Sequence, residues 1–378
     1  MKRKWTALLL TVCLIFTICS SGCSGAIELN DRVLVKGIGI DVKDELYEVT
    51  FHIFNAEASG ESEPDNIDVV STTGRSVFEA FDNLSLRTGK DGLFSQNLIL
   101  IIGEEAAKTG VSQLIDPFIR YPESRPTVQV LVAHGCTARE LMSCRYNDEL
   151  VKADVLADIA TSGETNSKVQ PVDLLTFAGD LKSRFAQPFA ASAHIETDGE
   201  NQQVVADGTA VFREDKLVGY LNSDETKGFL LLSGDIEGGA EAVEVPGVGM
   251  VTYAIQHTQS EVRASVREDT PCFDVSVSVD ANIYEIDYIT DENLPNRDYD
   301  VLEKALEERF QELIDRTLHI LADTLHTDIL DFGRRLLNSD PGYFKTVESN
   351  WAEVFATADI RTDISVSVKR IGQEINPL

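Results

Sequence analysis

Two neighbouring segments near the start of the chain read VLVKGIGID (residues 33–41) and LYEVTFHIF (residues 46–54). In both segments apolar residues alternate with others, which is the period of a half-buried β-strand. The polar residues 43–45 between them suit a tight turn. The pair therefore predicts two strands joined by a turn.

Strand and helix patterns alternate after these two strands. Residues 57–68 are acidic and contain Pro64, so we expect them to loop out. The following segments then predict a helix, a strand, two helices, a strand and a helix: 76–87 (ended by Gly89), 97–102, 104–110, 111–118 (with a break near Pro117), 127–133 and 137–144. This order is typical of a compact α/β unit.

The second half of the chain contains longer strand patterns. Residues 146–190 are ambiguous, with helical pieces at 149–160 and 173–182. Strands are expected at 190–196, 202–212 and 216–221, with a hairpin turn at 213–215, and several more over 241–285. Helices are expected at 225–232, 300–326, 328–337 and 343–355, before a closing strand at 362–369. The fold class is therefore α+β, with β-sheets flanked by helices and a long helix near the C-terminal end.

Length and charge limit the function classes. The chain has 378 residues, too many for one ordinary compact domain and enough for two or three. It carries 33 basic against 63 acidic residues, a formal net charge of −30. Such a surface repels phosphate backbones and anionic headgroups, so we expect no nucleic-acid partner and no adsorption to membranes by charge alone.

The first residues have the layout of a secretory signal. A basic start (MKRK, residues 1–4) precedes an apolar run over residues 7–19, which is too short to span a bilayer. The run ends in Ser20, Ser21, Gly22 and Cys23. Small residues before a cysteine resemble the bacterial lipobox, in which the cysteine becomes the first mature residue and carries diacylglycerol. Ordinary signal cleavage and an uncleaved anchor are the alternatives.

Lipid on Cys23 would hold the chain where charge cannot. Residues 1–22 contain three basic and no acidic residues, so their removal changes the net charge from −30 to −33. Two or three acyl chains anchor a protein stably, whereas one chain holds weakly. Because Ser24 and Gly25 offer only a short tether, we expect the folded body to lie close to the bilayer.

Three of the six cysteines remain after the leader and Cys23: Cys136, Cys144 and Cys272. An odd number in a chain of this length is not a disulfide framework. Cys136 and Cys144 could pair, and buried free thiols are the alternative.

Motifs that carry chemistry are missing from the sequence. It has no Walker loop, no complete Gly-x-Gly-x-x-Gly, no Gly-x-Ser-x-Gly, no His-Glu-x-x-His and no Cys-x-x-Cys. Its six histidines are scattered. We therefore predict no catalytic, cofactor-binding or metal-binding residues, and no enzyme activity.

Several sequence blocks resemble the C-subunit lipoproteins of bacterial spore germinant receptors, the Ger(x)C family. The blocks are VLVKGIGID (33–41), GRSVFEA (74–80), IIGEEAAKTG (101–110), AVFREDKLVGYL (210–221) followed by ETKG (225–228), TDILDFGR (327–334) and Asn350-Trp351. They are distributed along the whole chain. The lipobox departs from the usual pattern by having Ser20 in place of an aliphatic residue.

The resemblance implies a mixed α/β protein of three domains. Residues 1–22 would be the lipoprotein signal, 23–203 an N-terminal region of two domains, and 204–378 the C-terminal domain. It also implies a non-enzymatic receptor subunit, anchored by lipid on Cys23 at the extracytoplasmic face of the inner spore membrane. Its partners would be the A-type and B-type membrane subunits. The alternative is a lipoprotein that binds a small solute for a transporter.

The motif residues also have structural interpretations. We expect Tyr220 to pack on a sheet at the end of a strand, and Asp328 to cap a helix through its carboxylate. Phe332 and Trp351 are interpreted as core residues, and Gly333 as a site of close helix packing. On this interpretation the motifs mark a fold and do not form a ligand site.

Overall fold

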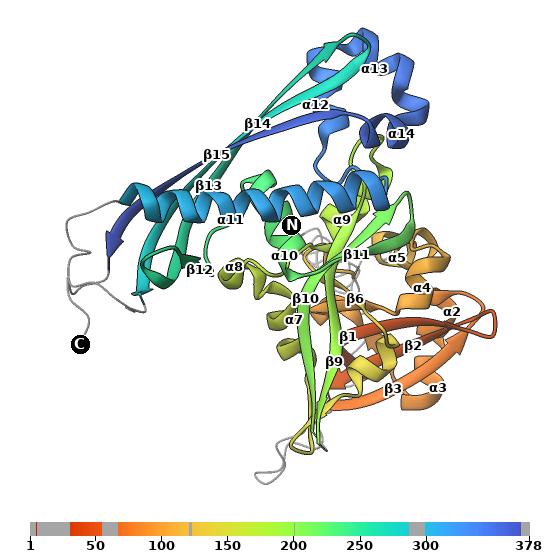
Figure 1. Cartoon of the computed structure of the whole chain (residues 1–378). Helices are drawn as coiled ribbons and strands as arrows, with labels where there is room; N and C mark the ends of the chain where they lie inside the picture. The colour runs from red at the N-terminus through yellow and green to blue at the C-terminus, as the bar shows by residue number, and fades with distance from the viewer. Residues whose placement is uncertain are drawn as a thin grey trace.

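The computed structural model describes Trp5 and residues 31–54, 67–120, 123–199, 201–286 and 299–371. Cys23 and residues 57–66 of the expected loop lie outside these residues. The described chain forms a nine-stranded sheet with helices on both faces and a four-stranded sheet packed against a long helix (Figure 1). The α+β class expected from the sequence is confirmed.

The two strands expected at the start are present. β1 (Arg32–Lys43) and β2 (Leu46–Phe54) are antiparallel. The turn between them places Asp44 and Glu45 at positive φ, as a two-residue hairpin turn of type I′ requires. β3 (Ile67–Gly74) adds antiparallel to β2. The sequence does not predict β3, because residues 67 and 68 at its start belong to the acidic segment expected to loop out.

Parallel strands form the centre of the larger sheet. β5 (Ile99–Ile102) pairs with β1, β6 (Gln129–Ala133) with β5, and β9 (Phe189–Asp198) with β6, all parallel. β10 (Asn201–Arg213) and β11 (Lys216–Leu221) complete the order β11-β10-β9-β6-β5-β1-β2-β3, and the short β4 (Asp91–Leu93) also pairs with β1. Because β10 runs through positions 203 and 204, both halves of the sequence contribute to this sheet.

Helices cover both faces of the larger sheet, as parallel strands require. One face packs against α2 (Val77–Asp82), α3 (Leu84–Thr88), α4 (Glu104–Thr109), α5 (Ser112–Arg120) and α9 (Leu174–Lys182). The other face packs against α6 (Ala138–Met142) and α7 (Ala153–Thr161). Short elements complete this half: η3 (Phe94–Gln96), β7 (Arg145–Tyr146), β8 (Glu149–Leu150) and α8 (Gly163–Asn166).

Three helix predictions in this half need correction. The helix expected at 76–87 is two helices separated at Asn83, although Gly89 ends the second one in a left-handed conformation as predicted. The helix expected from residue 149 begins at Ala153, because 149–150 form β8. Pro117 lies inside α5 and does not break it; a proline removes only one hydrogen bond, and the carbonyl left without it belongs to the exposed Gln113.

The smaller sheet is built from long strands. Its order is β12 (Ala240–Val245), β13 (Gly249–Arg267), β14 (Thr270–Ile286) and β15 (Asp359–Ile371), with β15 parallel to β14. α11 (Tyr299–His319) lies across one face, within the helix expected at 300–326 (Figure 1). Its buried residues include Leu302, Leu306, Phe310, Leu313 and Ile314, which form an apolar stripe at helical spacing. α10 (Ser223–Ser233) connects this sheet to the larger one.

Two side chains of α11 bond the edge of the smaller sheet. Glu303 accepts the backbone N–H of Val368 at 2.8 Å, and Glu307 accepts that of Val366 at 3.0 Å. These N–H groups point outward from β15, away from β14. An edge strand normally presents such groups for pairing with another chain, so this part of the edge is occupied.

The predicted helices at the C-terminal end start later or are divided. α11 ends at His319 and continues as one π-helical turn, η5 (Ile320–Thr324). The helix expected from 328 is α12 (Phe332–Ser339). The helix expected at 343–355 is α13 (Pro341–Val347), the short η6 (Glu348–Asn350) and α14 (Trp351–Ala356). Within the described part of the chain, none of the helices has the length and apolar content needed to cross a membrane.

Candidate functional site

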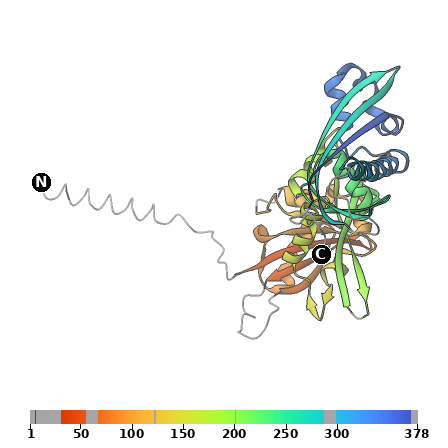
Figure 2. The same ribbon diagram turned by 60° about the vertical axis from the view of Figure 1, so that its left-hand side comes forward.

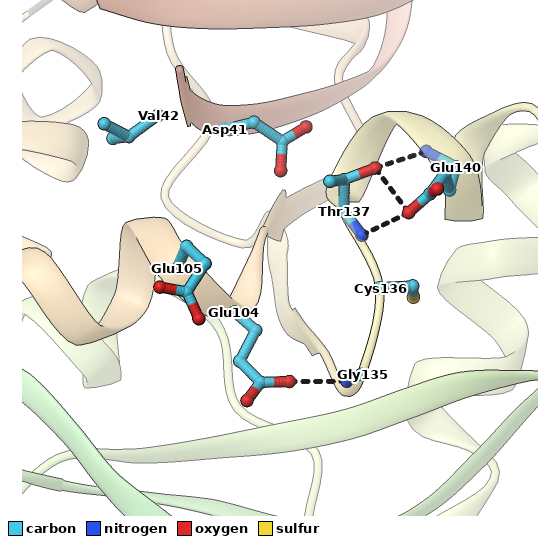
Figure 3. Close-up of a pocket in the computed structure, with 8 residues that line it drawn as sticks. All are labelled: Asp41, Val42, Glu104, Glu105, Gly135, Cys136, Thr137 and Glu140. Atoms are coloured by element: carbon cyan, nitrogen blue, oxygen red, sulfur yellow. Dashed lines mark hydrogen bonds between the residues drawn. The ribbon is translucent and has the colours of Figure 1, made fainter. Parts of the chain in front are cut away.

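A pocket of about 390 Å³ opens at the carboxyl ends of β1, β5 and β6 (Figure 3). This is the side of a parallel sheet on which α/β proteins usually bind ligands. Its lining combines acidic, polar and small residues: Asp41, Val42, Glu104, Glu105, Gly135, Cys136, Thr137 and Glu140. Asp41 and Glu104 belong to two of the sequence blocks singled out above.

The carboxylate of Asp41 caps a helix. It accepts hydrogen bonds from the backbone N–H groups of Ala138 and Arg139, both at 2.9 Å, at the first turn of α6. Burial raises the pKa of Asp41, and the two backbone hydrogen bonds oppose this effect. Both carboxylate oxygens are therefore already used to hold α6 against the end of β1.

Glu104 and Glu140 also bond to their own surroundings. Glu104 accepts the N–H of Gly135 at 2.5 Å and pairs with Lys108 at 2.7 Å. Burial alone would raise the pKa of Glu104, but the hydrogen bonds from Lys108 and Gly135 lower it overall. Glu140 accepts the N–H of Thr137 at 2.8 Å and forms a capping box with that residue. These bonds fix the loop between β6 and α6.

The thiol in this pocket is not activated. Burial first, and then the neighbouring carboxylates, raise the pKa of Cys136 to about 11. A nucleophilic cysteine needs the opposite shift. Cys136, Cys144 and Cys272 are free thiols. Cys144 and Cys272 are also buried, as the second alternative from the sequence has it, whereas Cys136 is half-buried. Nowhere in the described residues do three or more His, Cys, Asp or Glu side chains gather as a metal ion would require.

The ETKG block (225–228) connects three elements through α10. Glu225 forms a capping box with Asn222, and the hydroxyl of Thr226 lies 3.0 Å from that of Thr209 on β10. Lys227 donates to the carbonyl of Ala240 on β12 at 3.0 Å. A side chain at Gly228 would collide with α11, so the glycine permits the two helices to approach closely.

Lys227 belongs to a charge network between α10, β12 and α11. Its ammonium group binds Glu241 at 2.5 Å, and both side chains are buried, with 3% and 7% exposed. Glu241 also binds Arg309 at 2.7 Å, and Arg309 binds Asp224 at 3.0 Å. Each buried charge thus has an opposite partner, which burial of charge demands. The network joins α10 and α11 to β12 at the edge of the smaller sheet.

Tyr220 packs on the larger sheet as the sequence predicts. Its ring stacks on that of His134, with 3.9 Å between the ring centroids and 18° between the planes. The contact joins β11 to the loop that follows β6.

Asp328 lies at the centre of a second polar cluster, in which it is 2% exposed. Its Oδ1 accepts from the N–H groups of Leu330 and Phe332 at 3.1 Å. Its Oδ2 accepts from the N–H of Gly333 at 2.8 Å and from the indole Nε1 of Trp351 at 3.0 Å. The predicted capping role is confirmed, but the residue at the N-cap position is Asp331, which has a φ of 60°. The carboxylate of Asp328 therefore reaches the helix from one turn upstream.

The other residues of this signature surround Asp328. Phe332 stacks on Phe273 of β14 with 4.6 Å between ring centroids, and Trp351 is buried, so both are core residues as predicted. A Cβ on Gly333 would lie 3.0 Å from Nε1 of Trp351, so the glycine makes room for the indole. No local pattern in the sequence predicts the hydrogen bond from Trp351 to Asp328.

The free energy of unfolding should depend on the ionisation of Asp328. Burial raises its pKa from 3.8 to about 6, against the effect of its hydrogen bonds. Between these pH values the folded chain binds more protons than the unfolded chain, so stability falls as pH rises through this window and this contribution is constant above it. We expect Asp328→Asn to remove this slope. Unfolding free energies measured from pH 4 to 7 would contradict this if the two curves ran parallel.

Two family sequence profiles match nearly the whole chain. The profile described as "Spore germination protein N-terminal domain" matches residues 25–195, and "Spore germination B3/ GerAC like, C-terminal" matches residues 207–372. The first match contains the pocket, and the second contains the ETKG block and the Asp328 cluster. Cys23 lies outside the described residues, so the structure does not place it.

Individual spore germination proteins are also similar to this chain over nearly its whole length. Spore germination protein B3 of Bacillus subtilis is 24% identical over 93% of this chain and 94% of its own length. Spore germination protein KC of the same organism is 23% identical over 100% of this chain and 98% of its own length. The crystal structure of the GerBC protein has a TM-score of 0.55 and 18% identity, and the match covers 88% of this chain and 96% of that one. The last comparison supports the fold.

Proposed function

Because this chain belongs to the spore germination B3/GerAC-like family, we propose that it is the C subunit of a nutrient germinant receptor. It is held by lipid on Cys23 at the outer face of the inner spore membrane, and it works by assembly with the A-type and B-type membrane subunits. The observation that carries this proposal is the match of both family profiles, in sequence order, after a leader that ends in Ser-Ser-Gly-Cys.

The contacts of the motif residues favour a binding subunit over an enzyme. Asp41, Glu104 and Asp328 direct their carboxylates to backbone N–H groups of neighbouring elements. Lys227 and Gly228 hold α10 against β12 and α11. These residues therefore set the relative position of the elements, as a subunit that relays contacts between partners requires. Signalling would follow from how the two sheets are held together.

The alternative, a solute-binding lipoprotein, finds little support in the pocket. A solute site needs polar groups that are available to orient the ligand. In Figure 3 the side chains of Glu104, Thr137 and Glu140 bond to the protein itself. The receptor subunit is therefore the better conclusion.

The test is to replace Cys23 with alanine in the full chain, expressed with its membrane subunits in spores. We expect the share of the chain in the membrane fraction to fall to less than about a tenth, because the acyl chains that would anchor it are gone. Germination in response to nutrients should be lost with it. Cys19→Ala, a substitution within the same leader, is the matched control and should change neither measurement. Normal retention and normal germination of Cys23→Ala spores would disprove the proposal.

A further inference from the structure

The start of β1 identifies where a lipid tether would enter the folded body. Arg32, the first residue of β1, pairs with Asp91 of β4, directly after α3 and its turn. The guanidinium of Arg32 also binds Glu123 at 2.8 Å, just after α5. In Figure 2, the red strand β1 begins at the left-hand side of the lower half of the body, and the teal tip of the β13–β14 hairpin lies at the upper end.

The length of the tether limits how far this edge can be from a membrane. Cys23 and Asp31 are eight residues apart in the sequence. A chain spans at most about 3.6 Å per residue, so eight residues reach about 29 Å. For scale, this maximum tether length is shorter than the helix α11, whose 21 residues extend over about 31 Å of the folded body. A lipid on Cys23 therefore keeps the surface around Arg32 beside the bilayer.

The segment beside Arg32 carries two basic residues and an exposed apolar side chain. Residues 83–90 read NLSLRTGK and lie between Asp82 and Asp91. Leu84 of α3 is buried in the core, whereas Leu86 is 82% exposed, the highest value among the large apolar side chains of the described residues. Arg87 is exposed beside it. We call Leu86, Arg87 and Lys90 the tether face.

We propose that the tether face lies on the anionic phospholipid surface, with Leu86 among the headgroups and Arg87 and Lys90 beside the phosphates. This inference rests on the proposed lipid anchor at Cys23. Basic residues are attracted to anionic leaflets, and exposed apolar side chains enter the interface. The rest of the acidic body is repelled, so the molecule takes one orientation. α13 and the hairpin tip then point away from the bilayer, which leaves the smaller sheet accessible to protein partners.

A fluorescence experiment tests this orientation with the full acylated chain. It is reconstituted alone into vesicles of phosphatidylglycerol and phosphatidylethanolamine that carry brominated acyl chains. An environment-sensitive dye is attached at Leu86→Cys, or at Lys345→Cys as the matched control. Lys345 is exposed on α13, and α13 lies at the top of the molecule whereas β1 lies in its lower half (Figure 1). The parent chain corrects for labelling of Cys136, Cys144 and Cys272.

We expect the bromines to quench the dye at position 86 at least about threefold more than the dye at position 345, because interfacial segments sit at the boundary of headgroups and acyl chains. Arg87→Glu combined with Lys90→Glu should reduce the quenching at 86 by about half or more, since it reverses the attraction to anionic lipid. Lys304→Glu, an exposed lysine on α11, should not reduce it.

The outcomes separate this inference from the proposed function. If the chain floats with the vesicles but the two dyes are quenched equally, the tether face does not lie on lipid, although the anchor stands. If the charge-reversed variant is quenched as strongly as the parent, attraction to anionic lipid does not hold the face, and the inference falls as well. If the acylated chain does not float with the vesicles, the anchor and the orientation are both wrong.

Discussion

Asp328→Ala is expected to lower the free energy of unfolding by about 3–5 kcal/mol. The substitution leaves four buried donors without an acceptor: the N–H groups of Leu330, Phe332 and Gly333, and the indole of Trp351. Each buried donor that loses its acceptor costs about 1–3 kcal/mol, and partial relaxation keeps the total below the sum. Asparagine cannot replace the carboxylate fully, because its amide group would face donors with another donor.

The measurement is urea unfolding of the mature chain, followed by circular dichroism. Asp331→Asn is the matched control. Asp331 lies three residues away, forms a half-exposed pair with Arg334, and has a left-handed backbone that asparagine also adopts. We expect this control to change stability by less than about 1 kcal/mol. Equal losses for the two variants would show that the Asp328 cluster does not hold α12 and α14 together.

Removing Glu241 should destabilise the chain more than removing its partner Lys227. Glu241→Leu leaves the buried ammonium of Lys227 without a carboxylate, and it takes one of three acidic partners from Arg309. We expect a loss of about 3–5 kcal/mol. Lys227→Met should cost less, because Glu241 keeps its bond to Arg309. The double variant should be more stable than Glu241→Leu alone, since no buried charge is then left without a partner.

A double-mutant cycle by urea unfolding checks this expectation. The coupling energy between Lys227 and Glu241 should be about 2 kcal/mol. Lys304 and Glu308 form the comparison pair on the exposed side of α11, with 3.7 Å between their charged groups. Their coupling should be below about 0.5 kcal/mol. A Lys227–Glu241 coupling as small as that of the surface pair would mean that the network does not hold α10 against β12.

Local patterns in the sequence predicted the elements that depend on neighbouring residues. The alternation in β1 and β2, the glycine that ends α3 and the stripe of α11 all report the environment of a single element. The late start of α12 could not be predicted in this way. Asp331 takes a left-handed conformation there, and the helix is capped from Asp328, which Trp351 also bonds from 23 residues further along the chain.

In the pocket, too, the sequence predicts what depends on neighbouring residues and does not predict contacts between distant segments. Asp41 follows a strand pattern and Glu104 precedes a helix pattern, so an acid at the end of a buried strand was visible in the sequence. Their partners, the N–H groups of Ala138 and Gly135, lie 97 and 31 residues away and meet them only through the parallel order of β1, β5 and β6. Only the fold shows that Asp41 caps α6 and that Glu104 binds the loop before it.

The two glutamates of α11 that bond the outer side of β15 have a consequence for crowded copies of this protein. If a second copy brings one of its strands to this edge, the backbone N–H groups of Val366 and Val368 already have acceptors. The incoming strand therefore cannot extend the sheet by hydrogen-bonding to them. Many molecules collected on one surface can therefore stay separate at this border, and contacts made there must use side chains, whose shape and charge distinguish one partner from another.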